Sequence, residues 1–390
     1  MNYILFDGPA RGALLPFTFT RPVADIRIGI LTIREKWEKH LGYTTTTVTE
    51  EYLSDKYPMV EMEENVFINA SFLPTVDLVE IVKSLETNQA IFYDDDVIAF
   101  FATDGQEDVD FDTYEAIEFE SEVLRVEHLW DIYSKNGAAL EADFELLTEG
   151  RKSLPIPVSN NVIAPENIFL EEGARLEFCT LNATNGPIYI GKNAEIMEGS
   201  IIRGGFALCE DSIVKMGAKI YGPTTVGPNS KIGGEVNNSV IFGNSNKGHD
   251  GFLGNSVLGE WCNLGADTNN SNLKNNYDEV RLWSYETESF QKTGKQFCGL
   301  MMGDHSKSGI NTMFNTGTVV GVSANVFGDG FPRNFIPSFS WGGAHGYTIY
   351  RLDKVYETAN RVMERRGMEL SVEDKDILQH VFDLTYSNNK

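Results

Sequence analysis

Aliphatic residues recur at every sixth position of the chain from Gly186 onward, a spacing that neither an α-helix nor an ordinary β-strand produces. The uninterrupted run consists of Ile190, Ile196, Ile202, Leu208, Val214, Ile220, Val226 and Ile232. A six-residue period is typical of a parallel β-helix, in which short flat strands stack and each corner of the prism encloses an aliphatic side chain. The pattern therefore predicts a β-helix for the second half of the chain.

The period breaks at Asn238, shifts phase by two residues and then returns. It resumes at Phe252, Leu258 and Leu264. After an insertion it continues through Met302, Ser308, Phe314, Val320 and Val326. Glycines follow many of these residues, as expected where tight corners favour a residue without Cβ. We assign residues 153–343 to the β-helix and expect its inner column to include these positions.

Two segments of the second half lack the six-residue period. Residues 267–297 are rich in Asn, Tyr, Trp and Lys and are predicted to project from the prism as a loop, where functional groups often lie. Residues 344–390 contain apolar positions at helical spacing, and Ser371 is placed to cap a final helix. We expect these C-terminal helices to close the open end of the prism.

Residues 1–152 alternate short apolar runs with helical patterns, which predicts an α/β sheet with parallel strands, of the Rossmann-like kind. The first strand leads into a loop with Gly8 and Gly12, and Arg11 and Arg21 follow nearby. Backbone N–H groups in such a loop can hold a phosphate, and arginines can neutralise it. A tight turn with a solvated arginine explains the same residues equally well.

Composition and charge narrow the classes of partner. The chain has 390 residues and a formal net charge of -25, so it should repel nucleic acids and anionic membranes. No apolar run approaches the roughly 20 residues of a membrane span, and the first residues lack a signal-peptide pattern. The four cysteines form no CxxC pair. We expect a cytoplasmic protein with reduced thiols.

Three longer blocks carry a family resemblance. They read ILFDGPARGALLPFTFTRPVADIRIGILTIREKWE, HLWDIYSKNGAALEADF and GDHSKSGINTMFNTGTVVGVSANVFGDGFPRNFIPSFSWGG. Through them the chain resembles the bifunctional UDP-N-acetylglucosamine pyrophosphorylase/glucosamine-1-phosphate N-acetyltransferase family, in its divergent Bacteroidetes-type branch. The resemblance implies a nucleotidyltransferase-like domain followed by a left-handed β-helix, and the handedness comes from the resemblance alone.

The resemblance also implies an acetyltransferase site on the β-helix. In KGHDGFLGNSVLGEWCNLGADTNNSN, His249 stands where the family has its base, Phe252 where it usually has Tyr, and Asn263 and Asn272 where it has two asparagines. An imidazole can take the proton as a sugar amine attacks a thioester, and asparagines can orient the sugar or support the oxyanion.

Two other interpretations of His249 stay open. It is either a solvated histidine at a coil corner or a metal ligand, although His305 and His345 show no ligand spacing with it. The basic residues with which the family holds the sugar phosphate are missing, and Lys219, Lys231 and Lys247 are the nearby substitutes. Glucosamine 1-phosphate or another amino sugar phosphate is therefore the expected acceptor.

The N-terminal motif departs further from the family. Arg11 matches its arginine, Arg21-Pro22 replaces its Pro-Lys step, and Asn69 stands where a metal-binding carboxylate is usual. A neutral amide holds Mg²⁺ more weakly than a carboxylate does. The run Asp94–Asp96 either compensates for this change or forms a charged surface turn.

These observations predict a transferase of the sugar-nucleotide pathway. Its expected small-molecule partners are a sugar phosphate, acetyl-CoA and UTP or another NTP with Mg²⁺, the nucleotide being transferred by in-line attack on the α-phosphorus. The resemblance implies a homotrimer with acyl-CoA in the groove between prisms, reached by Lys274, Arg281 and Trp283 of the loop. Two alternatives are a catalytically degenerate N-terminal domain that binds a nucleotide or sugar, and a purely structural β-helix.

Overall fold

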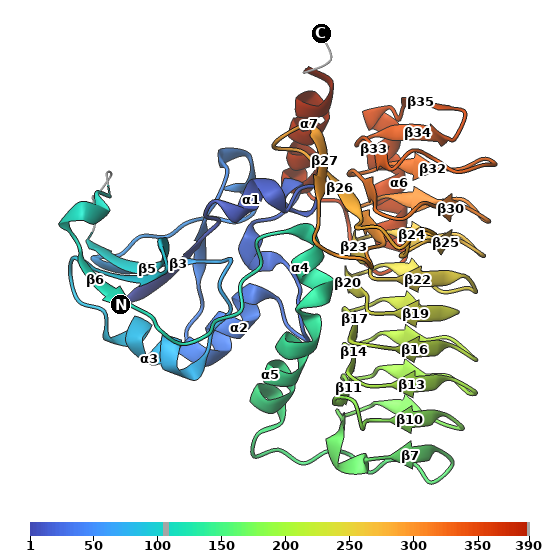
Figure 1. Cartoon of the computed structure of the whole chain (residues 1–390), viewed down its shortest axis with the longest axis horizontal. Helices are drawn as coiled ribbons and strands as arrows, with labels where there is room; N and C mark the ends of the chain where they lie inside the picture. Colours follow the sequence, from blue (N-terminus) through green and yellow to red (C-terminus); the bar gives the residue numbers. More distant parts are fainter. Residues whose placement is uncertain (104–108, 388–390) are drawn as a thin grey trace.

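A computed structural model describes residues 1–103 and 109–387. An α/β domain lies beside a long parallel β-helix, and two C-terminal helices stand near their junction (Figure 1). The predicted fold class is therefore confirmed. The domain boundaries after residues 152 and 343 stay predictions.

The N-terminal domain is built on a six-stranded sheet. Its strands lie in the order β2 (Thr46–Val48), β1 (Asn2–Phe6), β3 (Glu64–Asn69), β5 (Asp96–Thr103), β4 (Gln89–Tyr93) and β6 (Glu115–Glu118). Strand β1 is parallel to β2 and β3, but β5 runs antiparallel to β3 and β4. The expected all-parallel sheet is thus only partly right, because Asp94 adopts a left-handed turn (φ 53°) that joins β4 and β5 as a hairpin.

Five α-helices lie among the described residues of this domain. They are α1 (Ala10–Ala13), α2 (Ile33–Leu41), α3 (Val76–Ser84), α4 (Leu129–Ser134) and α5 (Asn136–Thr148). Helix α2 begins at Thr32, which forms a capping box with Glu35, and it ends at Gly42 in the left-handed conformation (φ 79°). A buried ion pair between Lys36 and Asp143 ties α2 to α5.

The β-helix has three parallel faces. The six-stranded face contains β7 (Asn161–Ile163), β10 (Thr180–Asn182), β13 (Ile201–Arg203), β16 (Lys219–Tyr221), β19 (Glu235–Asn237) and β22 (Phe252–Gly254). The nine-stranded face contains β8 (Ile168–Leu170), β11 (Ile188–Ile190), β14 (Phe206–Leu208), β17 (Thr224–Val226), β20 (Val240–Gly243), β23 (Val257–Glu260), β28 (Leu300–Met302), β31 (Thr318–Val320) and β33 (Phe335–Ile336). The ten-stranded face contains β9 (Arg175–Leu176), β12 (Glu195–Ile196), β15 (Ile213–Val214), β18 (Lys231–Ile232), β21 (Asn246–Lys247), β24 (Asn263–Leu264), β29 (Lys307–Ser308), β32 (Asn325–Val326), β34 (Ser340–Gly343) and β35 (Gly346–Ile349).

The inner column follows the six-residue period up to the break and again after it. All eight aliphatics of the first run are buried, as are Met302, Phe314 and Val326. Phe252 is wrongly placed by the sequence pattern, because Leu253 pairs with Val236 inside the prism and Phe252 faces outward. Each coil at the break contains fewer residues than three hexads. The inward-facing positions after the break therefore no longer continue the earlier six-residue series.

The glycines at the corners are required by close approach of the next coil. A Cβ on Gly191 would lie 2.7 Å from the backbone nitrogen of Glu210, and one on Gly227 would collide with the carbonyl of Phe242. The left-handed conformation is instead taken two residues later, by Asn193 (φ 56°) and Asn229 (φ 55°). Asparagine tolerates this conformation better than most residues with a side chain.

Residues 267–297 pack against the N-terminal domain. Two short strands, β25 (Asn269–Asn270) and β30 (Met313–Phe314), pair with each other, and β26 (Arg281–Ser284) forms an antiparallel hairpin with β27 (Ser289–Lys292). Val280 and Leu282 are buried in the same core cluster as Leu5 and Phe17. The segment projects from the prism as predicted, and its buried residues Val280 and Leu282 join the two halves of the chain. Figure 1 shows β26 and β27 between the β-helix and the N-terminal domain.

Helices α6 (Leu352–Glu364) and α7 (Val372–Ser387) also join the two halves. Their core contains Val355 and Val381 together with Phe19 of the N-terminal domain and Phe339 of the β-helix. Ser371 caps α7 as expected, since its hydroxyl accepts from the backbone nitrogen of Asp374 at 3.0 Å. The helices thus lie against the side of the last coils, and antiparallel β35 ends the ten-stranded face.

The four cysteines are buried and form no disulfide with one another. Among residues 1–103 and 109–387, no helix is long and apolar enough to cross a membrane.

Candidate functional sites

The glycine loop of the N-terminal domain lies at the carboxyl ends of β1 and β3. Phe6 and Asn69, the last residues of these strands, are paired in register. Gly8 takes a positive φ of 60°, and a Cβ there would lie 2.8 Å from Asn69 Oδ1. Ligands of open α/β sheets bind outside the carboxyl ends of the strands, so this edge is the first candidate site. We call it the β1/β3 crevice.

Two cavities meet at this crevice. A polar cavity of about 230 Å³ and an apolar cavity of about 450 Å³ share Pro9, Asn69 and Asp96. The polar one is further lined by Ser71, Arg125, Glu127, His128 and Glu286, and the apolar one by Phe6, Val48, Phe67, Phe100 and Phe111. A flat aromatic ring fits the second environment and a charged, hydroxyl-bearing group fits the first.

Arg11 is held inside the domain. Its guanidinium donates to the Asp7 carboxylate at 2.9 Å, to the Thr18 carbonyl at 2.7 Å and to the Tyr52 hydroxyl at 3.0 Å. Burial raises the pKa of Asp7, although Arg11 and the hydroxyl of Thr49 act in the opposite direction. These contacts make the loop rigid. They also occupy the guanidinium N–H groups that were expected to bind a triphosphate.

The Asn69 side chain is also engaged. Its Oδ1 accepts from the backbone nitrogen of Ser71 at 3.0 Å and from the Ser71 hydroxyl at 2.8 Å, and its Nδ2 donates to the Val97 carbonyl at 3.2 Å. An amide oxygen has two lone pairs, and both are used here. Within the described residues no three His, Cys, Asp or Glu side chains group to hold a metal ion. Asn69 therefore does not fit a Mg²⁺ ligand in this conformation.

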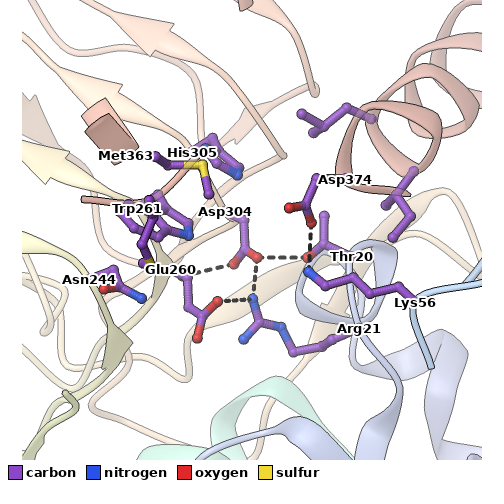
Figure 2. A pocket seen from close by; sticks show the side chains of 13 residues that line it. Thr20, Arg21, Lys56, Asn244, Glu260, Trp261, Asp304, His305, Met363 and Asp374 are labelled. Carbon is purple, nitrogen blue, oxygen red and sulfur yellow. Dashed lines mark hydrogen bonds and ion pairs between the residues drawn. The ribbon is translucent and has the colours of Figure 1, made fainter. Parts of the chain in front are cut away.

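Arg21 lies outside the crevice, at the junction with the β-helix. Its guanidinium pairs with Asp304 and lies 3.6 Å from Glu260, and its side chain is 5% exposed (Figure 2). These carboxylates raise the pKa of Arg21. The sequence placed Arg21 beside a phosphate, but the structure uses it to connect two domains.

His249 lies at the exposed corner between β21 and β22. Its ring makes no hydrogen bond with the described residues, and it lines neither cavity of the β1/β3 crevice. The corner itself is fixed from inside, because the Lys247 ammonium donates to the carbonyls of His249 and Asp250. Lys247 is 2% exposed, so it has no surface position from which to bind a phosphate.

The other residues assigned to the acetyl-transfer site fall into two groups. Phe252 and Asn272 both lie against Gly254. A Cβ on that glycine would be 2.5 Å from the Phe252 ring and 2.7 Å from Asn272 Nδ2, so the two side chains are neighbours. Asn263 stands beside Asn246 on the ten-stranded face, on the other side of the His249 corner.

Asn272 is fixed by a hydrogen bond from its Nδ2 to Asn255 Oδ1 at 2.8 Å. Asn255 follows β22 and His249 precedes it, so the imidazole and Asn272 lie at opposite ends of that strand. Lys219 is exposed on the six-stranded face, two strands below β22, and lies 3.9 Å from Glu235.

Sequence reasoning missed two asparagines that bridge a gap in the six-stranded face. Asn269 Oδ1 accepts from the backbone nitrogen of Phe252 at 2.8 Å, and Asn270 Oδ1 accepts from that of Gly254 at 2.9 Å. These side chains replace a backbone ladder between β22 and β25. The sequence shows a run of asparagines in this segment. It does not show which of their side chains bind the backbone of the strand below.

Comparisons with known proteins agree with this architecture. Residues 3–152 match the family model described as sugar nucleotidyl transferase. The bifunctional protein GlmU of Methanocaldococcus jannaschii is 29% identical over 212 residues, which cover 51% of this chain and 43% of that protein. A bifunctional sugar-1-phosphate nucleotidylyltransferase/acetyltransferase of Sulfurisphaera tokodaii is 28% identical over 144 residues, covering 36% of this chain and 35% of that protein.

The chain spans less than half the length of these relatives. Among solved structures, Arabidopsis UDP-N-acetylglucosamine acyltransferase is 14% identical, with 60% of this chain and 92% of that chain covered and a TM-score of 0.26.

The chain thus joins a domain that matches the sugar nucleotidyl transferase model to a parallel β-helix. More closely, the chain is similar to the bifunctional GlmU-like proteins. Its place in a Bacteroidetes-type branch stays a prediction.

Proposed function

We propose that this protein transfers a nucleotidyl group to a sugar 1-phosphate in the β1/β3 crevice and an acetyl group from acetyl-CoA to an amino sugar phosphate on the β-helix. UDP-N-acetylglucosamine or a related nucleotide sugar is the product. The observation that carries the proposal is the crevice, where Gly8 packs on Asn69 between a polar and an apolar cavity.

In the crevice, the backbone of the glycine loop approaches the nucleotide phosphates, and the apolar cavity takes the base. The polar cavity, with Asp96 and Arg125 paired at 2.7 Å, takes the hydroxyl-bearing sugar ring. Positioning of this kind supplies much of the catalysis of phosphoryl transfer. Mg²⁺ would supply charge neutralisation when bound, but the engaged Asn69 amide does not fit it.

On the β-helix, the His249 imidazole has no partner in the described residues and is free to take a proton from the attacking amine. Phe252 and Asn272 offer an apolar surface and an amide for the sugar. The corner is open in a single chain, and a neighbouring copy in a homotrimer would enclose it.

A Gly8→Val substitution tests the crevice. The added side chain meets Asn69 and is strained at positive φ, so pyrophosphate release from UTP, Mg²⁺ and N-acetylglucosamine 1-phosphate should fall by at least about 100-fold. Acetyl transfer should stay unchanged in the same protein. Unchanged pyrophosphate release would remove the crevice as the site.

A His249→Gln substitution tests the β-helix. Thiol release from acetyl-CoA with glucosamine 1-phosphate should fall by about 100-fold or more, because the general base is lost. The control is His345→Gln, which removes an exposed histidine bound to Asp329 at 2.9 Å on another coil. Equal rates for His249→Gln and the unsubstituted protein would favour a purely structural β-helix.

A second function is favoured for the N-terminal domain by a specific observation. Arg11, Arg21 and Asn69 are all engaged in contacts within the chain, which leaves the domain suited to bind a nucleotide or sugar without turnover. Calorimetric binding of UTP that is indifferent to Mg²⁺, with no pyrophosphate released, would identify it as a binding or assembly module.

A further inference from the structure

A cavity of about 220 Å³ lies where three parts of the chain meet (Figure 2). Lys56 comes from the N-terminal domain, Asn244 and His305 from corners of the β-helix, and Met363 and Asp374 from the C-terminal helices. The proposed reactions do not use this junction cavity, because neither the β1/β3 crevice nor His249 borders it.

Three buried polar atoms of the lining residues have no hydrogen-bond partner: Arg21 Nε, Asn244 Oδ1 and His305 Nδ1. Only four other buried side-chain nitrogen or oxygen atoms of the described residues share this condition. Buried polar groups are nearly always paired in native proteins. Their gathering around one cavity therefore points to a partner that fills it.

The charges of the lining exclude an anion as that partner. Arg21 is paired with Asp304 and Glu260, and Lys56 donates to Asp374 at 2.6 Å. Carboxylates thus outnumber the cations in the lining, and the cations are already neutralised. A phosphate, a nucleotide or coenzyme A would be repelled. A cation cannot accept from the unpaired Arg21 Nε, so an uncharged partner fits best.

The unpaired atoms differ in what they need. The Nε of Arg21 only donates, Oδ1 of Asn244 only accepts, and a neutral imidazole nitrogen does either according to its tautomer. Burial lowers the pKa of His305 to about 4, which keeps its ring neutral at pH 7. Hydroxyl groups both donate and accept, so a polyhydroxylated molecule offers the kinds of group that all three atoms lack.

The remaining wall is apolar and includes Trp261, Met363 and Leu378. An aromatic ring and aliphatic side chains pack against the C–H face of a sugar ring. The volume equals that of about seven liquid waters, which is enough for one monosaccharide. We propose that the junction cavity binds an unphosphorylated monosaccharide and thereby joins the N-terminal domain, the β-helix and the C-terminal helices.

Calorimetry and thermal unfolding of the full chain with glucose, N-acetylglucosamine and glucose 1-phosphate test this proposal. At least one uncharged sugar should bind saturably and raise Tm, and glucose 1-phosphate should bind more weakly than glucose. Asn244→Gly keeps the left-handed corner (φ 54°) and removes the amide, so it should weaken binding about tenfold. Asn193→Gly, at a corner with φ 56°, is the matched control and should leave binding unchanged.

A second pair of variants tests the proposal without relying on a single hydrogen bond. Met368→Trp fills the cavity from a residue that is 37% exposed and should abolish binding, whereas Met216→Trp, at a residue 69% exposed on the β-helix, should not. His249→Gln should also leave sugar binding unchanged, which separates this site from the acetyl-transfer site. No saturable binding of either uncharged sugar, or binding insensitive to both Asn244→Gly and Met368→Trp, would overturn the proposal.

Discussion

At the scale of single residues, Lys247 shows how the interior of the β-helix accommodates a charge. It occupies an inner-column position above Ile232, where the sequence period leads one to expect an aliphatic residue. Its ammonium donates to two backbone carbonyls, and burial lowers its pKa to about 8. The charged form is therefore less favourable in the folded chain than in the unfolded one.

Replacing Lys247 with Met should raise the free energy of unfolding by about 1–2 kcal/mol at pH 7, because a buried charge is exchanged for an apolar side chain. The folded pKa of about 8 lies below the usual value of about 10.4 for lysine. The unfolded chain thus binds more protons between these values, so this residue makes stability rise from about pH 8 to about pH 10.4. The free energy of unfolding, measured with urea at pH 7 and pH 9.5, should rise less between these pH values in Lys247→Met than in the unsubstituted protein.

Lys231→Met is the matched control, since Lys231 lies one coil below on the outer surface of the same face. It should change stability little at either pH. A loss of stability in Lys247→Met at pH 7 would mean that the two carbonyl contacts outweigh the burial of the charge.

A coil corner was one of the open interpretations of His249, and the sequence did not show the partners of most candidate residues. Arg21 pairs with Asp304, which is far away in the chain, and no pattern of spacing reports such a contact. Lys247 turned inward because the coil between Val226 and Ile241 is short, and the period gave no sign of that.

At the scale of elements, the break in the six-stranded face is bridged by side chains. Asn270 is 5% exposed, and its amide both accepts from and donates to the backbone of Gly254. Asn269 makes the corresponding contact to Phe252 from an exposed position. On this face, the buried amide of Asn270 therefore makes the contact to the next coil that backbone hydrogen bonds make elsewhere.

Asn270→Ala should lower the free energy of unfolding by about 2–3 kcal/mol, because two backbone groups of Gly254 lose a buried partner. Asn269→Ala should cost less than about 1 kcal/mol, since water can replace an exposed side chain. Chemical unfolding of the two variants measures the difference. Equal effects would show that burial does not separate the two asparagines.

Elements with a regular spacing of apolar residues could be predicted from the sequence. Elements that are fixed by packing against residues far away in the chain could not. The strands β1, β3 and β5 and the helices α2 and α3 follow from local patterns, and the β-helix follows from its hexads. The hairpin of β26 and β27 was expected only as a projecting loop, because the sequence does not show that Val280 and Leu282 are buried against the N-terminal domain.

At the scale of the whole molecule, the two halves behave as one structure. Arg21, Thr20 and Asp304 form a buried contact between them, in which the Thr20 hydroxyl donates to the Asp304 carboxylate at 2.8 Å. A buried ion pair contributes little net stability compared with an apolar pair, but removing one partner leaves an uncompensated charge.

Arg21→Met should lower the free energy of unfolding by about 3–5 kcal/mol and should separate the unfolding of the N-terminal domain from that of the β-helix in a calorimetric scan. The double variant Arg21→Met/Asp304→Asn should recover most of the loss, because the amide still accepts from Thr20 and carries no charge. If the double variant is no more stable than the single one, the ion pair is not the cause.

The hairpin places Glu286 against Gly12, so a residue contributed by the second half of the chain forms a wall of the polar cavity in the first. A gene fragment that encodes only the first half would therefore produce a crevice with one side missing. The polar cavity is therefore complete only in a chain that carries both the glycine loop and this hairpin.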